Sequence, residues 1–401
     1  MSSSSSSSNP SASPVSKLRR GWFEHVKPNQ SLLLNHLEEM LGERAKHLPK
    51  RMFADKGDIS KENWVRSPSD PNVIKLRKYL KENNGIPGLE ICQPHEVKKA
   101  AAIFRRDGFV AVANVLTPEQ LKEIKGATER VLDDILSKDP DASIGGGAGS
   151  LPLRYSFGVS SATRQMLHDM AWCNLIDLPT TTPILQEIFG VKNKFTLIGA
   201  GGDVCLPGAI EYQRLHRDLQ TGKDPYVDKT GRTTLLDLPP PMVTINFCMV
   251  DFTFENGPTR QIKGTQNMHV DPPALIDEPE WMKLSTCMPI KAGGCLFRDP
   301  RAWHGGTPNL SNHVRAIPNV EYGAPWFRHP DAGYNFTRKT LPYDNWIKLS
   351  DHAQKITKGI RAEPGQPVIG AGFMHPDFRK REAYVYEQTE KRKKELGIAK
   401  L

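Results

Sequence analysis

Short runs of apolar residues recur through the middle of the chain, and this pattern predicts β-strands separated by turns. The runs cover residues 109–115, 195–197, 243–250, 288–290, 295–297 and 316–322, with Gly and Pro between them. Their spacing is typical of two facing antiparallel sheets that close into a barrel. The sequence therefore predicts a mainly β fold with flanking helices.

A helix is predicted ahead of the strands, because Leu33, Leu37, Met40 and Leu41 recur at helical intervals. A second helix is predicted to begin after Thr117. Threonine can cap a first turn, the following proline suits the first helical position, and a glutamine three residues after the threonine completes a capping box. The apolar positions of this second helix share one face, which we expect to cover the barrel: Leu121, Ile124, Val131 and Ile135.

The chain of 401 residues is 38% hydrophobic, which suits one substantial core with extensions better than two equal domains. Residues 1–17 are rich in serine and too polar to pack, so we expect disorder there. Residues 18–94 are interpreted as a helical extension and linker, and residues 95–375 as the barrel domain. Residues 376–401 are expected to form a basic C-terminal helix or tail.

The formal net charge is +9, but much of the excess lies in the terminal segments and is not interleaved with aromatic residues. Nucleic acid is therefore not an expected partner. The six cysteines include no Cys-x-x-Cys pair, which favours free thiols in a reducing compartment. No apolar run reaches the ~18 residues of a membrane-spanning helix, so no span is expected.

Four polar residues carry the candidate chemistry. His216 and Asp218 stand two positions apart, and Arg315 follows His304 by eleven. On an extended segment, the side chains of residues i and i+2 share a face, so His216 and Asp218 can reach one ion. Two imidazoles and one carboxylate can bind Fe(II) and leave positions for a bidentate co-substrate and O2. A guanidinium pairs with a carboxylate, so Arg315 is the candidate for binding the distal acid group of 2-oxoglutarate.

A second His-x-Asp triplet, His269-Val270-Asp271, has the same spacing and is an alternative ligand pair. Pro272 and Pro273 follow it directly. Because proline cannot donate the hydrogen bonds of a sheet, the chain is expected to leave the sheet there. His216 and Asp218 instead precede a polar loop, as the end of a strand would, and are therefore preferred.

Four separated stretches occur in a recognisable order: Phe104 to Leu121, His216-Arg217-Asp218-Leu219, Glu255-Asn256-Gly257-Pro258-Thr259, and Gly294 to Arg315. Together they resemble the phytanoyl-CoA dioxygenase family of Fe(II)- and 2-oxoglutarate-dependent oxygenases. They resemble, in turn, the family's opening strand and first helix, its proximal ligand motif, its mid-barrel turn and its closing hairpin. The resemblance implies a double-stranded β-helix, which is a jelly-roll or cupin-like barrel.

The resemblance also implies iron ligands at His216, Asp218 and His304 and a 2-oxoglutarate clamp at Arg315. This chain has a glycine where the family often has a small hydroxyl residue, two positions after the distal histidine, so Thr307 becomes the candidate substitute donor. From the strand pattern, Thr244 and Asn246 are expected to face the site together. Asn246 is therefore a further candidate for binding the co-substrate.

The implied reaction is hydroxylation of a small organic substrate with release of succinate and CO2. An acyl-CoA is the first substrate class to expect, and amino-acid derivatives and natural products are alternatives. The side chains that could bind its anionic groups are Arg154, Arg214 and Arg217. The final residues Ala399-Lys400-Leu401 resemble a peroxisomal address, so we expect an import receptor as a partner and a peroxisomal, otherwise cytoplasmic, location.

Three other functions stay open at this point. A cupin-like isomerase or lyase would share the metal ligands but would not need Arg315. A non-catalytic binding protein on the same fold would have lost at least one of the four candidate residues. An oxygenase directed at nucleic acid would use the positive charge and would show salt-sensitive affinity for DNA or RNA.

Overall fold

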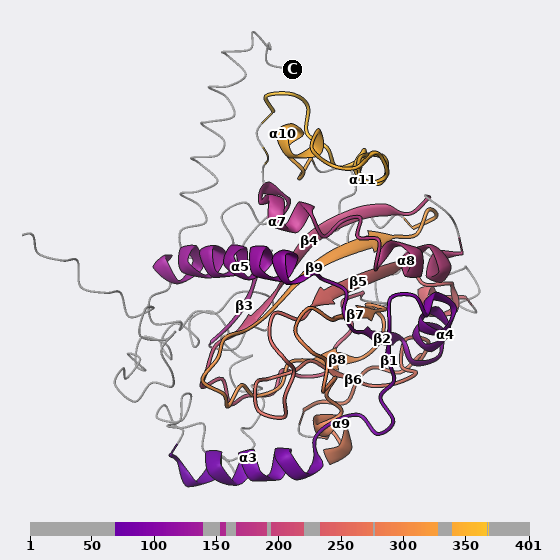
Figure 1. The fold of residues 1–401 in the computed structure, drawn as a ribbon. Coiled ribbons are helices and arrows are strands. Elements are labelled where there is room, and N and C mark those ends of the chain that lie inside the picture. Colours follow the sequence, from indigo (N-terminus) through magenta and orange to yellow (C-terminus); the bar gives the residue numbers. More distant parts are fainter. Residues whose placement is uncertain are drawn as a thin grey trace, which may run out of the picture.

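The computed structural model describes residues 69–138, 153–157, 166–190, 194–219, 233–275, 277–327, 339–366 and 368. Figure 1 shows these parts as coloured ribbons. The helix expected around residues 33–41, the serine-rich tail, the basic segment 376–401 and the terminal tripeptide lie outside the described residues. The expected division at residues 17, 94 and 375 stays a prediction.

The centre of the fold is a seven-stranded sheet (Figure 1). Its order is β1-β2-β7-β5-β9-β4-β3, and its pairs are antiparallel except for β1 with β2, which is parallel. The strands are β1 (Ile91–Cys92), β2 (Phe109–Val112), β3 (Arg154–Ser156), β4 (Thr196–Cys205), β5 (Met242–Phe247), β7 (Cys295–Arg298) and β9 (Arg315–Gly323).

A second, smaller sheet pairs β6 (Arg260–Gln261) with β8 (His304–Gly305). Isolated bridges extend it on both sides, because His216 pairs with His304 and Arg260 pairs with Thr286. The fold is therefore rich in sheet, as the sequence predicted. The smaller sheet matters for function because it contains one candidate metal ligand and borders another.

Helices cover one face of the large sheet (Figure 1). The face that they cover is apolar and includes Val110, Ile245, Phe297 and Val320, all at most 1% exposed. Across all the described residues, the helices are α3 (Pro71–Asn83), α4 (Val97–Asp107), α5 (Pro118–Lys138), α7 (Met170–Cys173), α8 (Thr182–Phe189), α9 (Glu280–Leu284), α10 (Tyr343–Trp346) and α11 (Asp351–Thr357), with short 3-10 turns at Met166–His168 and Leu235–Asp237.

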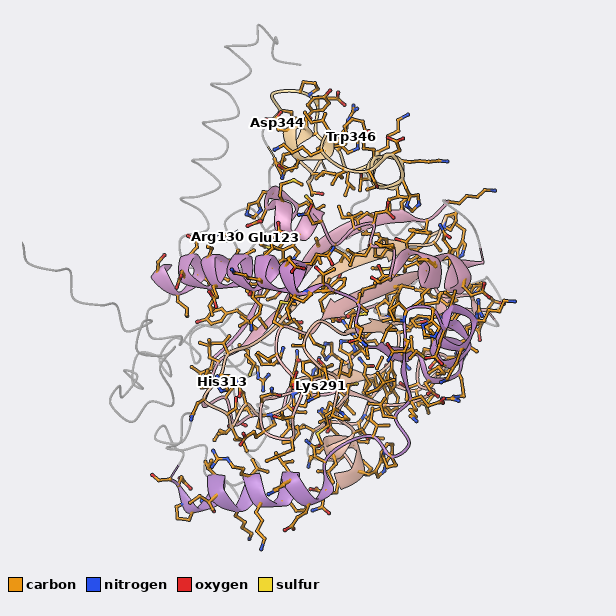
Figure 2. All side chains as sticks on the ribbon, in the orientation of Figure 1. Glu123, Arg130, Lys291, His313, Asp344 and Trp346 are labelled. Atoms are coloured by element: carbon orange, nitrogen blue, oxygen red, sulfur yellow. The ribbon has the colours of Figure 1, made fainter. Side chains whose placement is uncertain are left out.

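Helix α5 begins where the sequence predicted. The Thr117 hydroxyl accepts a hydrogen bond from the Gln120 amide at 3.2 Å, and the Gln120 side chain accepts one from the Thr117 amide at 2.9 Å. This reciprocal pair is the expected capping box. Figure 2 labels Glu123 and Arg130 on this helix, which bond to Asn174 and Asp169 beside α7. The expected apolar face of the helix packs into the main core.

Helix α3 lies away from the large sheet, below the small sheet in Figure 1. Its buried residues Val73, Leu76 and Leu80 pack with Ile210 and Leu310. The helix ends at Asn83. It lies within residues 18–94, for which a helical extension and linker were expected, and that extension stays a prediction.

Two strand predictions are corrected. Residues 288–290 form a turn rather than a strand, and Ile290 is buried because it packs with Cys287 and Leu296. The short run at 195–197 is instead the start of the ten-residue strand β4, which continues through glycines. At Gly202, with φ +129°, a Cβ would lie 2.4 Å from the Ile317 carbonyl oxygen, so the close approach of β9 requires glycine.

The opposite face of the large sheet is polar, and this face positions the site. Directly opposed residues of antiparallel strands point to the same side, so the register defines rows of side chains. One row contains Arg298, Thr244, Glu321 and Gly199, and the next contains Leu296, Asn246, Asn319 and Gly201. We call this side of the sheet the site face.

All six cysteines are buried and unpaired, as expected for free thiols. Within the described parts of the chain, no helix is both long and apolar enough to cross a bilayer.

Candidate metal and co-substrate site

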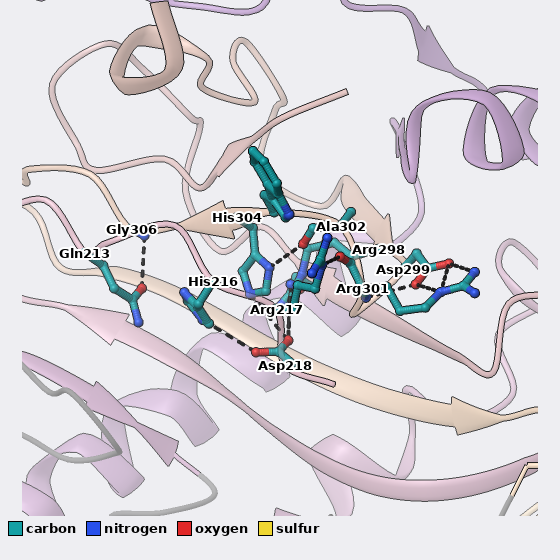
Figure 3. A network of polar contacts seen from close by, with 12 residues as sticks. Gln213, His216, Arg217, Asp218, Arg298, Asp299, Arg301, Ala302, His304 and Gly306 are labelled. Carbon is teal, nitrogen blue, oxygen red and sulfur yellow. Dashed lines mark hydrogen bonds and ion pairs between the residues drawn. The ribbon is translucent and has the colours of Figure 1, made fainter. Parts of the chain in front are cut away.

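Three potential metal ligands meet at the small sheet. One ligand atom each from His216, Asp218 and His304 lies within 4.8 Å of the other two. The Asp218 carboxylate oxygens lie 3.5 Å from His216 Nε2 and 3.3 Å from His304 Nε2. Figure 3 shows the two rings and the carboxylate pointing toward one another. Among the described residues, no other group of three His, Cys, Asp or Glu side chains has such spacing.

Backbone pairing brings the two histidines together. The His216 amide donates to the His304 carbonyl at 3.0 Å, and the His304 amide donates to the His216 carbonyl at 3.1 Å. Opposed residues of such a pair share a face, so both rings point to the same side. The expectation of a regular strand over residues 216–218 is corrected, because His216 makes only an isolated bridge and the Asp218 amide bonds the Pro300 carbonyl.

Each imidazole is oriented by its second nitrogen. Nδ1 of His304 lies 2.9 Å from the Ala302 carbonyl oxygen, and Nδ1 of His216 lies 3.1 Å from that of Arg214. A carbonyl oxygen can only accept, so Nδ1 carries the hydrogen and Nε2 is left with a lone pair. This is how metal-binding histidines are commonly held.

The protonation states of His304 and Asp218 suit a cation. Burial by itself would lower the pKa of His216, but its contact with the Asp218 carboxylate outweighs this and raises it. Burial lowers the pKa of His304 to about 4, so its imidazole is neutral at pH 7. Burial by itself would raise the pKa of Asp218, but its interactions with His304, His216 and Arg298 outweigh this and hold the pKa well below the usual range. The site therefore presents a neutral imidazole and an ionised carboxylate, the states that bind a metal.

The three ligands differ in exposure. The side chain of His304 is 8% exposed, whereas those of His216 and Asp218 are 27% exposed. The ligand set is therefore closed on the His304 side and open beside His216 and Asp218. An octahedral ion held there by three ligands has coordination positions free for a bidentate co-substrate and O2.

Arg298 is the residue that sequence reasoning missed. Its guanidinium lies 3.3 Å from the Asp218 carboxylate, and its Nε donates to the Asn246 carboxamide oxygen at 2.8 Å. It ends strand β7 on the site face, and Figure 3 shows it beside Asp218. A charged residue at the end of an otherwise apolar strand was the signal that could have identified it.

We expect Arg298→Lys to weaken Fe(II) binding about 10-fold, because outer residues that orient metal ligands have effects of that order. Lysine keeps the charge but cannot contact the Asp218 and Asn246 side chains with one planar fork. The dissociation constant is to be measured by competition with Mn(II), followed by electron paramagnetic resonance. Arg361→Lys, near Trp346 and outside the site, is the matched control. Equal affinity of the two variants would contradict the positioning role.

Arg315 is buried with an unsatisfied donor. Its Nε donates to the Gly257 carbonyl at 2.8 Å, whereas its Nη1 has no partner in the described chain. Only 3% of the residue is exposed. Leaving such a group unpaired costs about 1–3 kcal/mol or more, so the guanidinium is suited to an incoming carboxylate. The predicted clamp stands first on β9 and on the site face.

The two further co-substrate candidates differ in their hydrogen bonding. The Thr307 hydroxyl donates its hydrogen to the Pro258 carbonyl at 2.6 Å, and its role as a donor to 2-oxoglutarate stays a prediction. Asn246 lies on the site face, and its Nδ2 is buried without a partner among the described residues. Its role in binding the co-substrate stays a prediction.

The two glycines after His304 have a local explanation. A Cβ on Gly305 would lie 2.8 Å from the Gln213 carbonyl oxygen, and one on Gly306 would lie 2.7 Å from the Arg154 guanidinium. Arg154 therefore fills the space in which the family often has a hydroxyl side chain.

Two of the three arginines that could bind anionic groups already have backbone partners. Arg154 donates to the backbone carbonyls of Glu211 and Thr307. Arg217 donates to those of Arg301 and Val270, so both guanidiniums have protein partners. Arg214 is exposed, and its role stays a prediction.

The alternative triplet is divided between two unrelated contacts. His269 Nε2 lies 2.8 Å from the Asp237 carboxylate, and Asp271 lies 3.6 Å from the Arg217 guanidinium. Neither residue joins the ligand group. The preference for His216 and Asp218 agrees with this geometry.

Comparison with known proteins adds sequence and structural relatives. Residues 104–317 match the family model described as Phytanoyl-CoA dioxygenase (PhyH). The Fe(II)/2-oxoglutarate-dependent dioxygenase nvfF of Aspergillus novofumigatus (strain IBT 16806) is 24% identical over 255 residues, which cover 62% of this chain and 73% of the relative.

Solved structures also match. AviO1 from Streptomyces viridochromogenes Tue57 is 18% identical with a TM-score of 0.40, and the match covers 58% of this chain and 97% of AviO1. The epimerase SnoN, in complex with Fe3+, alpha ketoglutarate and nogalamycin RO, is 18% identical with a TM-score of 0.41. That match covers 57% of this chain and 84% of SnoN.

Proposed function

The chain belongs to the phytanoyl-CoA dioxygenase family and is an Fe(II)- and 2-oxoglutarate-dependent dioxygenase, and we propose that His216, Asp218 and His304 bind its iron and Arg315 its 2-oxoglutarate. The observation that carries the residue assignment is the convergence of the three ligand atoms within 4.8 Å. The buried, unpaired Nη1 of Arg315 supports it independently. We also propose that the two sheets form the double-stranded β-helix expected from the family.

When bound, Fe(II) supplies the activation of O2 that couples decarboxylation of 2-oxoglutarate, to succinate and CO2, to oxidation of the substrate. The protein holds the ion through two imidazoles and one carboxylate, whose orientation is set by backbone carbonyls and by Arg298. Arg315 neutralises the distal carboxylate of the co-substrate and fixes its direction. The site face then positions one C–H bond of the substrate.

For the substrate we propose a small organic molecule that is hydroxylated at one carbon. An acyl-CoA is one class to test, because of the family to which the chain belongs. A natural product or amino-acid derivative is the other, and the carboxylates of Asp203 and Glu321 on the site face favour it.

The clamp is tested by Arg315→Lys. We expect the dissociation constant for 2-oxoglutarate to rise about 100-fold, because lysine cannot form the bidentate charge-assisted pair and such bonds contribute ~1.5–3 kcal/mol. Binding is to be followed anaerobically by titration of the Fe(II) protein.

The control ligand is 2-oxobutyrate, which has the same keto-acid end but no distal carboxylate. Its affinity should be the same in the wild type and in Arg315→Lys. If both ligands weaken equally, Arg315 supports the metal site in general and does not bind the distal carboxylate.

A further inference from the structure

Two carboxylates on the site face have no role in the proposed iron site. Asp203 on β4 is opposed by Ile317 of β9, and Glu321 of β9 is opposed by Gly199 and Thr244. The register therefore places both on the same side of the sheet as Arg315. Among the described residues, neither carboxylate makes a hydrogen bond or ion pair. The residue Asp203 is exposed, and Glu321 is half-buried.

A third acceptor lies between them. Asn319 stands two positions before Glu321 on β9, is 7% exposed, and its carboxamide oxygen has no partner in the described structure. A buried amide oxygen without a hydrogen bond costs about 1–3 kcal/mol, so this position suits a ligand that donates a hydrogen bond. We call Asp203, Asn319 and Glu321 the acceptor row.

The neighbouring strand leaves the acceptor row accessible. Gly199 and Gly201 of β4 stand opposite Glu321 and Asn319 and carry no side chain. A ligand can therefore approach the β4 backbone closely beside both acceptors.

Both arginines of the site face already have a partner or an assigned ligand. Arg298 bonds to Asp218 and Asn246, and Arg315 is assigned to the co-substrate, so neither guanidinium is left for an anionic substrate. The carboxylates are not neutralised by protein partners. Burial raises the pKa of Glu321 to about 7, and the negative charge of Asp218 adds to this effect.

We propose that the acceptor row accepts hydrogen bonds from N–H or O–H groups of the substrate. The substrate is then a neutral or cationic hydrogen-bond donor rather than an anionic acyl-CoA. This inference rests on the proposed function, because the iron site defines which end of the substrate faces the row. A protonated amine and a hydroxyl group share the required donor chemistry. A carboxylate or phosphate would instead meet the negative charges of Asp203 and of ionised Glu321, which disfavours its binding.

The test uses the anaerobic Fe(II)·2-oxoglutarate protein and four probes that share one hydrocarbon chain. The probes are octylamine, octan-1-ol, octanoate and octanoyl-CoA, and their dissociation constants are measured by isothermal titration calorimetry. Octylamine should bind at least about 10-fold more tightly than octanoate or octanoyl-CoA. The affinity of octan-1-ol should lie between that of octylamine and those of the two anionic probes. Comparing octylamine with octan-1-ol shows whether the row prefers an ammonium or a hydroxyl donor.

The double variant Asp203→Asn with Glu321→Gln removes both charges at nearly equal size. It should reduce the preference for octylamine over octanoate to less than about 3-fold. Glu321→Gln alone should reduce it in part, and serves if the double variant folds poorly. The matched control is Asp344→Asn with Glu363→Gln, which removes two carboxylates outside the site and should leave the preference unchanged. Figure 2 labels Asp344 on α10.

The proposal is overturned if neither octylamine nor octan-1-ol binds, if octanoate or octanoyl-CoA binds as tightly as the better of these two donors, or if the double variant keeps the wild-type preference. The iron assignment is read separately, from the visible band that forms when Fe(II) and 2-oxoglutarate are added. If the band forms but the probes do not bind in the expected order of affinity, only the role of the acceptor row is rejected. The absence of a band rejects the proposed iron site.

Discussion

His304→Ala is expected to lower 2-oxoglutarate turnover at least about 1,000-fold, because metal chemistry contributes several kcal/mol and His304 is the most buried of the three ligands. Its loss also leaves a gap on the closed side of the ligand group, opposite His216. Succinate formation and Fe(II) content of the purified variant are the measurements.

His269→Ala provides the control for this variant. It removes the histidine of the alternative triplet, which contacts Asp237 rather than the ligand group. It should retain activity close to the wild type. If His304→Ala kept more than about a tenth of the iron-dependent turnover, the ligand assignment would be wrong.

Glu278→Gln is expected to lower the free energy of unfolding by about 3–5 kcal/mol, because it leaves the charge of Arg260 buried and uncompensated. Both side chains are 0% exposed, and Arg260 Nη2 lies 3.1 Å from Glu278 Oε1. Arg260 also bonds the Gln213 carbonyl, three residues before His216, so the ion pair supports the ligand segment. Urea unfolding of the metal-free protein gives the free energy.

Asp251→Asn is the comparison for an exposed pair. The Lys291 and Asp251 side chains are 73% and 47% exposed, and such pairs contribute about 1 kcal/mol or less. A double variant, Arg260→Met with Glu278→Leu, should recover most of the lost stability, because no buried charge is left. If Glu278→Gln and Asp251→Asn lowered the free energy of unfolding equally, the buried ion pair would contribute no more to stability than the exposed one.

The sequence predicted those parts of the site that have a local signal. His216 and Asp218 are recognisable from their spacing, and Arg315 from its offset after His304. The strands that carry Arg298 and Arg315 were predicted as well, because each contains apolar residues that fill the core on one face. The capping box of Thr117 and Gln120 was predicted for the same reason, since both partners lie within one turn.

The acceptor row and the partners of Arg298 could not be predicted, because they depend on how distant segments pair. Asp203 and Glu321 are far apart in sequence, and only the pairing of β4 with β9 places them on one face. The apolar run at 288–290 was wrongly predicted as a strand. Its residues are apolar because Ile290 packs against Leu296, and a turn allows this contact as well as a strand does. The length of β4 was missed because its glycines are allowed by the close approach of β9, a tertiary contact.

The two faces of the large sheet connect stability with function. One face is apolar and packs under the helices, which keeps the strands in fixed register. The other carries the polar rows, so the same register places Arg315 and the acceptor row on one side of the sheet. A shift of one residue between β4 and β9 would exchange the faces and remove the site.

The iron assignment is tested most directly by adding Fe(II) and 2-oxoglutarate, without oxygen, to the purified metal-free wild type and to His216→Ala. A visible metal-to-ligand charge-transfer band should form in the wild type and be absent from the variant. Circular dichroism confirms that both proteins are folded. No band in a folded wild type, or an equal band in His216→Ala, would contradict the claim that these residues hold iron and 2-oxoglutarate together.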